Sequence, residues 1–136
     1  MSKLEQTLSI IKPDAVERDL DNEIKKIFIS KGFEIIKEKK IQIEKSEAEK
    51  FYKVHETKPF FNDLCSYLSS GPIVVMILEK EDAVKANREI MGSTNPKDAA
   101  EGTIRKKFGI SIDKNSVHGS DSIENARIEI DFFFKD

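Results

Sequence analysis

A continuous run of six apolar residues, Ile73-Val74-Val75-Met76-Ile77-Leu78, constrains the fold of this chain more than any other segment. The run has the length of a strand, and Gly71-Pro72 precedes it. Because no polar residue alternates with the apolar ones, both faces of this strand must be covered. The run therefore predicts a strand at the centre of a sheet, with helices packed on it.

The remaining elements follow from hydrophobic periodicity and end signals. Alternation and β-branched residues predict further strands over 7–11, 33–43 and 115–119. Periodic apolar residues, capping signals and glycine stops predict helices from Asp21 to Gly32, after Ser46 with Glu49 as a capping box, and over 60–68, 82–91, 103–108 and 122–133. The resulting order is typical of one α+β domain, residues 1–136. We expect a ferredoxin-like (split βαβ) sandwich, with an antiparallel sheet of about four strands covered by helices.

Composition excludes several classes of protein. The chain carries 23 basic and 25 acidic residues, a net charge of −2, whereas a protein that coats nucleic acid has a strong basic excess. Its longest uncharged apolar stretch, Pro72 to Leu78, is too short to span a bilayer. Cys65 is the only cysteine, which excludes an internal disulfide and suits a reducing compartment. We expect a cytoplasmic protein that binds neither membrane nor nucleic acid as its main ligand.

The segment Asn115-Ser116-Val117-His118-Gly119-Ser120-Asp121 is the strongest candidate for a functional site. His118 lies among small polar residues, and a histidine can attack phosphorus or transfer a proton near pH 7. Asn, Gly, Ser and Asp are also the usual residues of turns, so an ordinary turn is the alternative interpretation. A metal site is weakly supported, because His55 and His118 share no ligand spacing with Cys65.

Cations and aromatic residues elsewhere in the chain suit a polyphosphate ligand. They lie at element ends or in the long connection 92–114, which is more typical of function than of simple linkage. The candidates for phosphate contact are Lys12, Arg88, Thr94 and Arg105. Tyr52 and Phe60 lie on the first helical hairpin, and either offers a flat face to a nucleobase.

Several sequence blocks occur in an order and with a spacing that resemble nucleoside diphosphate kinases. The blocks are Lys12-Pro13-Asp14, Lys58-Pro59-Phe60-Phe61, Gly71-Pro72-Ile73-Val74-Val75, Asn87-Arg88-Glu89-Ile90-Met91-Gly92, Thr94-Asn95-Pro96, Gly102-Thr103-Ile104-Arg105 and the segment 115–121. The resemblance extends from about Thr7 to Phe134. It implies an enzyme that transfers the γ-phosphate of a nucleoside triphosphate to a nucleoside diphosphate by a ping-pong mechanism.

The resemblance implies a role for each candidate residue. The phosphate-carrying histidine corresponds to His118, and the lysine that reaches the ribose hydroxyl and the transferring phosphate corresponds to Lys12. The phosphate-binding residues correspond to Arg88, Thr94 and Arg105, the ribose-contacting asparagine to Asn115, and the base-stacking ring to Phe60. Tyr52 corresponds to a tyrosine behind the histidine, and Ser120 with Glu129 to the pair that orients it.

The same resemblance implies the cofactor and the assembly. Mg²⁺ is expected to arrive with the nucleotide phosphates, with no protein metal ligands, and the chain is expected to form a homo-oligomer, either a hexamer or a tetramer. Stacking without base-edge hydrogen bonds predicts broad base tolerance. Ala15, Asp19 and Asn22 replace glycines that are frequent in the family, so we expect an altered local backbone there. The alternative function is a non-catalytic module that binds nucleotide or nucleic acid for regulation.

Overall fold

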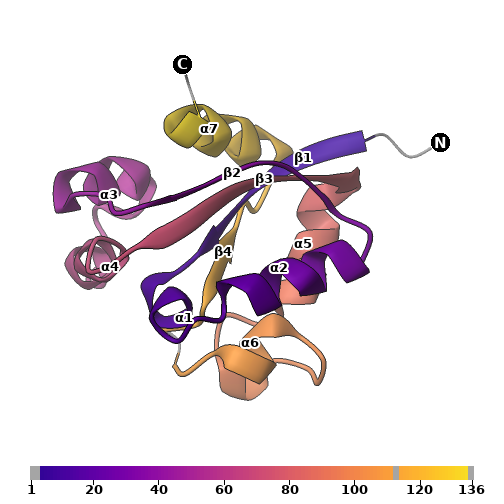
Figure 1. The fold of residues 1–136 in the computed structure, drawn as a ribbon. Helices are drawn as coiled ribbons and strands as arrows, with labels where there is room; N and C mark the ends of the chain where they lie inside the picture. The colour runs from indigo at the N-terminus through magenta and orange to yellow at the C-terminus, as the bar shows by residue number, and fades with distance from the viewer. Residues whose placement is uncertain (1–3, 112–113, 135–136) are drawn as a thin grey trace.

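The computed structural model describes residues 4–111 and 114–134, so the other residues of the predicted domain 1–136 lie outside the described part (Figure 1). Its strands are β1 (Leu4–Ile11), β2 (Glu34–Ile41), β3 (Ile73–Glu81) and β4 (Val117–Gly119). They form a four-stranded sheet in the order β2-β3-β1-β4, and each neighbouring pair is antiparallel. This topology confirms the ferredoxin-like α+β fold expected from the sequence.

The apolar run within β3 is buried on both faces, as its composition predicted. Val74, Met76 and Leu78 belong to one hydrophobic cluster, whereas Ile73 and Val75 belong to another. Neighbouring side chains of a strand point to opposite faces, so each cluster occupies one side of the sheet.

Helices cover both faces of the sheet (Figure 1). The Val74 side carries α1 (Pro13–Glu17), α2 (Asp21–Ser30), α5 (Ala83–Met91) and α6 (Ile104–Phe108). The Ile73 side carries α3 (Lys45–Phe51), α4 (Phe61–Leu68) and α7 (Ile123–Phe134). Short 3₁₀ turns, η1 (Lys53–His55) and η2 (Pro96–Asp98), lie in the connections. No helix of the described residues combines the length and apolar character needed to cross a membrane.

The N-caps of two helices differ from the residues that the sequence suggested. Leu20, and not Asp21, is the N-cap of α2, because the Leu20 carbonyl already accepts the first helical bond from the Ile24 N–H at 2.9 Å. The capping box predicted at Ser46 is wrong by two residues: Glu44 is the N-cap of α3, and its N–H donates to Glu47 at 3.3 Å. An acidic side chain accepts the hydrogen bonds of a cap as well as serine does, so composition alone could not choose between Glu44 and Ser46.

The connection between α5 and β4 contains the short helix α6. The helix predicted over 103–108 is α6, and Thr103 is its N-cap, with Oγ1 accepting from the Lys106 N–H at 3.3 Å. This cap places Arg105 in the first turn of a helix that packs beneath β4, because Ile104 is fully buried in the same cluster as Val117. The long connection therefore carries a buried cation to the strand that holds His118.

Candidate active site

His118 lies on β4, opposite Ile10 of β1, and one of its ring nitrogens is held by a carboxylate. Its Nε2 lies 2.9 Å from Oε1 of Glu129, which α7 brings across the end of the sheet. Ser120 Oγ donates to the same Oε1 at 2.8 Å. The side chains of His118 and Glu129 are 21% and 18% exposed, so the pair lies near the surface but is largely shielded. Nδ1 is the ring nitrogen outside this contact.

Backbone pairing fixes the segment on both sides of His118. The Ser120 N–H donates to the Leu8 carbonyl at 3.2 Å, and the Leu8 N–H donates to Ser120 Oγ at 3.3 Å. On the other face, helix α5 packs directly on Gly119, where a Cβ would lie 2.3 Å from Nδ2 of Asn87. A larger residue there would displace the ends of the Asn87 and Met91 side chains, so the glycine of the histidine motif suits the close packing of α5.

Aromatic rings surround the imidazole on the α3 side. The Phe51 ring lies 5.3 Å from that of His118 at an interplanar angle of 74°, an edge-to-face contact. Tyr52 lies 6.5 Å away, and its burial, followed by the nearby Glu129 charge, raises the pKa of the phenol well above its ordinary value. Tyr52 thus forms part of the wall behind the histidine as a neutral side chain. Phe51 was not predicted as a site residue.

A row of rings leads from the histidine to the predicted base-stacking residue. Ring centroids of Tyr52 and His55 are 6.3 Å apart, and those of His55 and Phe60 are 6.0 Å apart. Phe60 is 46% exposed, so one face of its ring is open to a ligand. His55, which the sequence did not mark as a site residue, is half-buried between the two aromatic rings. Periodicity could not identify this contact because η1 interrupts the helix.

Lys12 and Asn115 meet at the end of β1. Nζ of Lys12 donates to Oδ1 of Asn115 at 3.0 Å, and Nδ2 of Asn115 donates to the Thr94 carbonyl at 3.2 Å. Lys12 and Asn115 are 6% and 2% exposed, whereas Thr94 is exposed. The structure therefore joins three of the predicted site residues in one chain of hydrogen bonds.

Arg105 is a buried cation with a fixed orientation. Its Nη1 donates to the Gly92 carbonyl at 3.0 Å, and its Nη2 donates to the Val117 carbonyl at 2.9 Å. Burial, and then the nearby Arg88 charge, lowers the pKa of Arg105 to about 10. Its buried Nε has no hydrogen-bond partner among the described residues. An anion beside this guanidinium would relieve both the desolvation and the repulsion from Arg88.

A pocket of about 750 Å³ brings the predicted phosphate-binding residues together. Arg88, Thr94 and Arg105 line it together with Lys85. Its lining also includes the carboxylates of Glu5, Asp82, Glu89 and Asp121. His118 and Phe60 are not among its lining residues, so the pocket lies beside the histidine and not over it. Arg105 connects the two regions, because it lines the pocket and bonds to Val117, the residue before His118.

The positions that depart from the family's glycines are accommodated locally. Asp19 has a φ of 59°, in the left-handed region that glycine adopts freely and aspartate tolerates. Ala15 is fully buried in the cluster on the Val74 side of the sheet, and Asn22 lies in the first turn of α2. None of these residues bears a predicted role in the site.

Comparisons with known proteins identify the family. A family profile described as "Nucleoside diphosphate kinase" matches residues 5–136. Proteins of that name from Campylobacter jejuni and Geobacter sulfurreducens are 58% and 56% identical to this chain over 132 and 131 residues. The alignment with the first covers 97% of this chain and 96% of the relative, and that with the second covers 96% of each.

Solved structures give the same result. The nucleoside diphosphate kinase of Aquifex aeolicus superposes with a TM-score of 0.96 at 43% identity, covering 98% of this chain and 96% of that one. The enzyme of Encephalitozoon cuniculi superposes with a TM-score of 0.94 at 37% identity, covering 97% of this chain and 90% of that one.

The class of protein is therefore an α+β phosphotransferase. The chain belongs to the nucleoside diphosphate kinase family. This membership confirms the family resemblance and the kinase function that it implied, and it does not favour the alternative of a non-catalytic regulatory module.

Proposed function

We propose that this chain transfers the γ-phosphate of nucleoside triphosphates to nucleoside diphosphates through a phosphohistidine at His118. The observation that carries the proposal is the contact of His118 Nε2 with Glu129 at 2.9 Å. A carboxylate there favours the tautomer with the proton on Nε2, which leaves the lone pair on Nδ1 available for attack. A protein that only binds nucleotide has no need of a nucleophile held in this way.

The reaction consists of two matched half-reactions. Nδ1 of His118 forms a bond to the γ-phosphorus while the bond from that phosphorus to the β–γ bridging oxygen breaks, and the nucleoside diphosphate leaves with the electron pair. An acceptor diphosphate then attacks the same phosphorus through a terminal β-oxygen, and the P–N bond breaks. Glu129 holds the Nε2 proton throughout, and Ser120 holds Glu129 through its bond of 2.8 Å.

Positive side chains would supply most of the rate enhancement, because phosphoryl transfer depends on positioning and charge stabilisation. We assign the phosphate contacts to Arg88, Thr94 and Arg105, which line one pocket. Lys12 reaches the ribose and the transferring phosphate, where Asn115 accepts its hydrogen bond at 3.0 Å and would itself bind the ribose.

The base would stack on Phe60, with Tyr52 forming the wall behind His118. The exposed face of Phe60 supports this role, and stacking alone accepts any base. We therefore expect similar turnover of purine and pyrimidine diphosphates. Steady-state turnover of the four common diphosphates would measure this, and strict selectivity for one base would contradict it.

Mg²⁺ would enter as part of the substrate, bound to the nucleotide phosphates. Among the described residues, no group of three or more His, Cys, Asp or Glu side chains is placed to hold a metal ion. The side chains assigned to the phosphates are cationic or neutral, which suits an already metal-bound polyphosphate better than a protein metal cage.

We also infer that residues 1–136 act as one catalytic domain within a homo-oligomer, a hexamer or tetramer, in the cytoplasm. The match to the family over residues 5–136 supports the single domain. Cys65 is buried and free, which suits a reducing compartment. Light scattering after size exclusion would distinguish the two oligomers.

The labelling experiment tests the proposed function. Purified protein is incubated with γ-labelled ATP and Mg²⁺, and an acid-labile, alkali-stable label should appear on it and vanish when a diphosphate is added. A His118→Ala variant should take up no label. Label uptake and transfer by that variant would overturn the assignment.

A further inference from the structure

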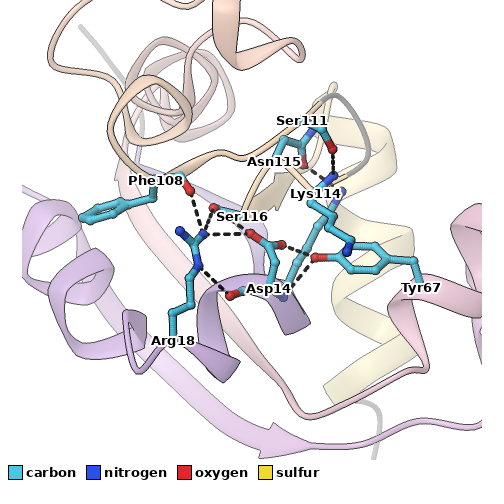
Figure 2. Close-up of polar contacts among 9 residues, drawn as sticks. Asp14, Arg18, Tyr67, Phe108, Ser111, Lys114, Asn115 and Ser116 are labelled. Carbon is cyan, nitrogen blue, oxygen red and sulfur yellow. Dashed lines mark hydrogen bonds and ion pairs between the residues drawn. The ribbon is translucent and has the colours of Figure 1, made fainter.

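A buried carboxylate that the mechanism above does not use, that of Asp14, lies among polar contacts with Arg18, Tyr67 and Ser116 (Figure 2). The Asp14 side chain is 3% exposed and accepts hydrogen bonds from donors on three parts of the chain. Its Oδ2 accepts from Ser116 Oγ at 3.0 Å and from Nη2 of Arg18 at 3.1 Å, and its Oδ1 accepts from the Tyr67 hydroxyl. Asp14 therefore joins α1, α4 and the turn before β4.

Further bonds tie the same group to the end of α6. Nη2 of Arg18 donates to the Phe108 carbonyl at 2.6 Å, and Nε of Arg18 donates to the Asp14 carbonyl at 2.9 Å. The Tyr67 hydroxyl also accepts the Asp14 N–H at 3.0 Å. The Arg18 side chain is 37% exposed, and an ion pair with an exposed partner contributes little net stability, although it fixes geometry. The role of this ion pair is therefore better explained by the positions of the residues that it holds than by a contribution to the free energy of unfolding.

The turn held by Asp14 connects the catalytic histidine to the ribose-binding residues. Ser116 has a φ of 76°, a left-handed conformation that is uncommon for serine. Its carbonyl accepts the Lys12 N–H at 2.8 Å, while Asn115 beside it accepts from Lys12 Nζ at 3.0 Å. The direction of the chain at Ser116 thus determines how Asn115, before it, and His118, after it, lie relative to Lys12.

We propose that Asp14 is a positioning residue of the phosphotransfer site, acting through Ser116 Oγ to hold the Asn115–His118 segment against Lys12. The inference rests on the proposed function of His118. Asp14 follows Lys12 by two residues and binds Ser116 across the chain, so a single carboxylate fixes both sides of the site.

Substituting two partners of Asp14, Ser116 and Tyr67, separates a positioning role from general stabilisation of the fold. Ser116→Ala removes the link from Asp14 to the histidine segment, together with the 3.4 Å bond from Nη2 of Arg18 to Ser116 Oγ, and leaves the bonds of Asp14 to Tyr67 and Arg18 in place. Tyr67→Phe removes the link to α4 and leaves the Ser116 bond in place. Tyr67 is a suitable control because burial and the bond to Asp14 raise the pKa of its phenol, so it is a neutral hydrogen-bond donor at any working pH.

The experiment measures single-turnover label uptake from γ-labelled ATP by full-length wild type, Ser116→Ala and Tyr67→Phe, below the melting temperature of each. Ser116→Ala should be labelled at least about tenfold more slowly, since a misplacement of about 1 Å can cost a hundredfold. Tyr67→Phe should lose melting temperature but keep a labelling rate within about twofold of wild type, since its hydroxyl does not contact the histidine segment. Wild-type labelling in Ser116→Ala, or rate losses that follow melting temperature in both variants, would overturn the proposal.

Ser116→Gly separates the hydroxyl from the backbone conformation, because glycine adopts a positive φ freely. It should be as slow as Ser116→Ala, and recovery of the wild-type rate would overturn the role of Asp14. The His118 imidazole resonances add a readout that does not need activity: they should shift in Ser116→Ala and not in Tyr67→Phe. A wild-type protein that takes no label would instead refute the proposed function, whereas a labelled wild type with an unaffected Ser116→Ala would refute only this inference.

Discussion

Replacing Glu129 tests the pairing on which the phosphohistidine mechanism depends. Oε1 of Glu129 receives two hydrogen bonds, from His118 Nε2 at 2.9 Å and from Ser120 Oγ at 2.8 Å. Glu129→Gln retains an oxygen of nearly the same position but loses the negative charge. Glu129→Ala removes both bonds and leaves the imidazole without its acceptor.

The geometry sets the size of the expected effect. A hydrogen bond to a charged group contributes about 1.5–3 kcal/mol and a neutral one about 0.5–1.5 kcal/mol, so Glu129→Gln removes about 1 kcal/mol from the interaction with the ring. Since about 1.4 kcal/mol corresponds to tenfold in rate, Glu129→Gln should form phosphohistidine about fivefold more slowly. Glu129→Ala should be slower by about 10- to 100-fold, as found for groups that orient a reactive imidazole.

Rapid-quench labelling with γ-labelled ATP, in a single turnover, measures this step separately from product release. Glu124→Gln is the matched control, because it removes the same charge from an exposed position on the same helix. Its labelling rate should equal that of wild type. Folded Glu129→Ala protein that is labelled as fast as wild type would refute the reasoning that the carboxylate orients His118.

Two further predictions follow from the buried groups of the site. Arg105→Lys should raise the nucleotide Kd at least about tenfold, because one ammonium cannot replace a guanidinium that spans two carbonyls and, under the proposed function, would also contact a phosphate. Calorimetry measures this Kd, and a value within about twofold of wild type would contradict the prediction. Tyr52 and Tyr67, the only tyrosines, both have a pKa raised above the ordinary 10.0, so the folded protein should show no phenolate absorbance at pH about 11. In the unfolded chain both phenols ionise near pH 10, so the free energy of unfolding should fall as pH rises above that value. Phenolate absorbance of the folded protein at pH about 11 would contradict the burial of the two phenols.

Strong local signals predicted most of the fold. The apolar run 73–78 identified the central strand, and Thr103 correctly identified the start of α6. Helix α1 was not predicted, because Pro13 suits the end of a strand as well as the first position of a helix. A proline is compatible with either the end of a strand or the start of a helix. At Pro13 the burial of Ala15 and Val16 in the core favours the helix.

The predicted site depended on motifs, and the structure adds what motifs omit. The His118–Glu129 pair was expected from the family resemblance, whereas the bond between Lys12 and Asn115 was not. The contact of Phe51 with His118 was not predicted, because an aromatic residue on a helix face has no signature that separates it from core. The link from Asp14 to Ser116 joins residues 102 positions apart, so only the fold could reveal it.

The position of the phosphate on the imidazole tests the central claim most directly. Wild-type protein labelled with γ-labelled ATP is hydrolysed in alkali, and the two phosphohistidine isomers are separated and identified against standards. Because Glu129 occupies Nε2 of His118, the account predicts that the phosphate is on Nδ1. Phosphate on Nε2, or on a residue other than His118, would contradict it.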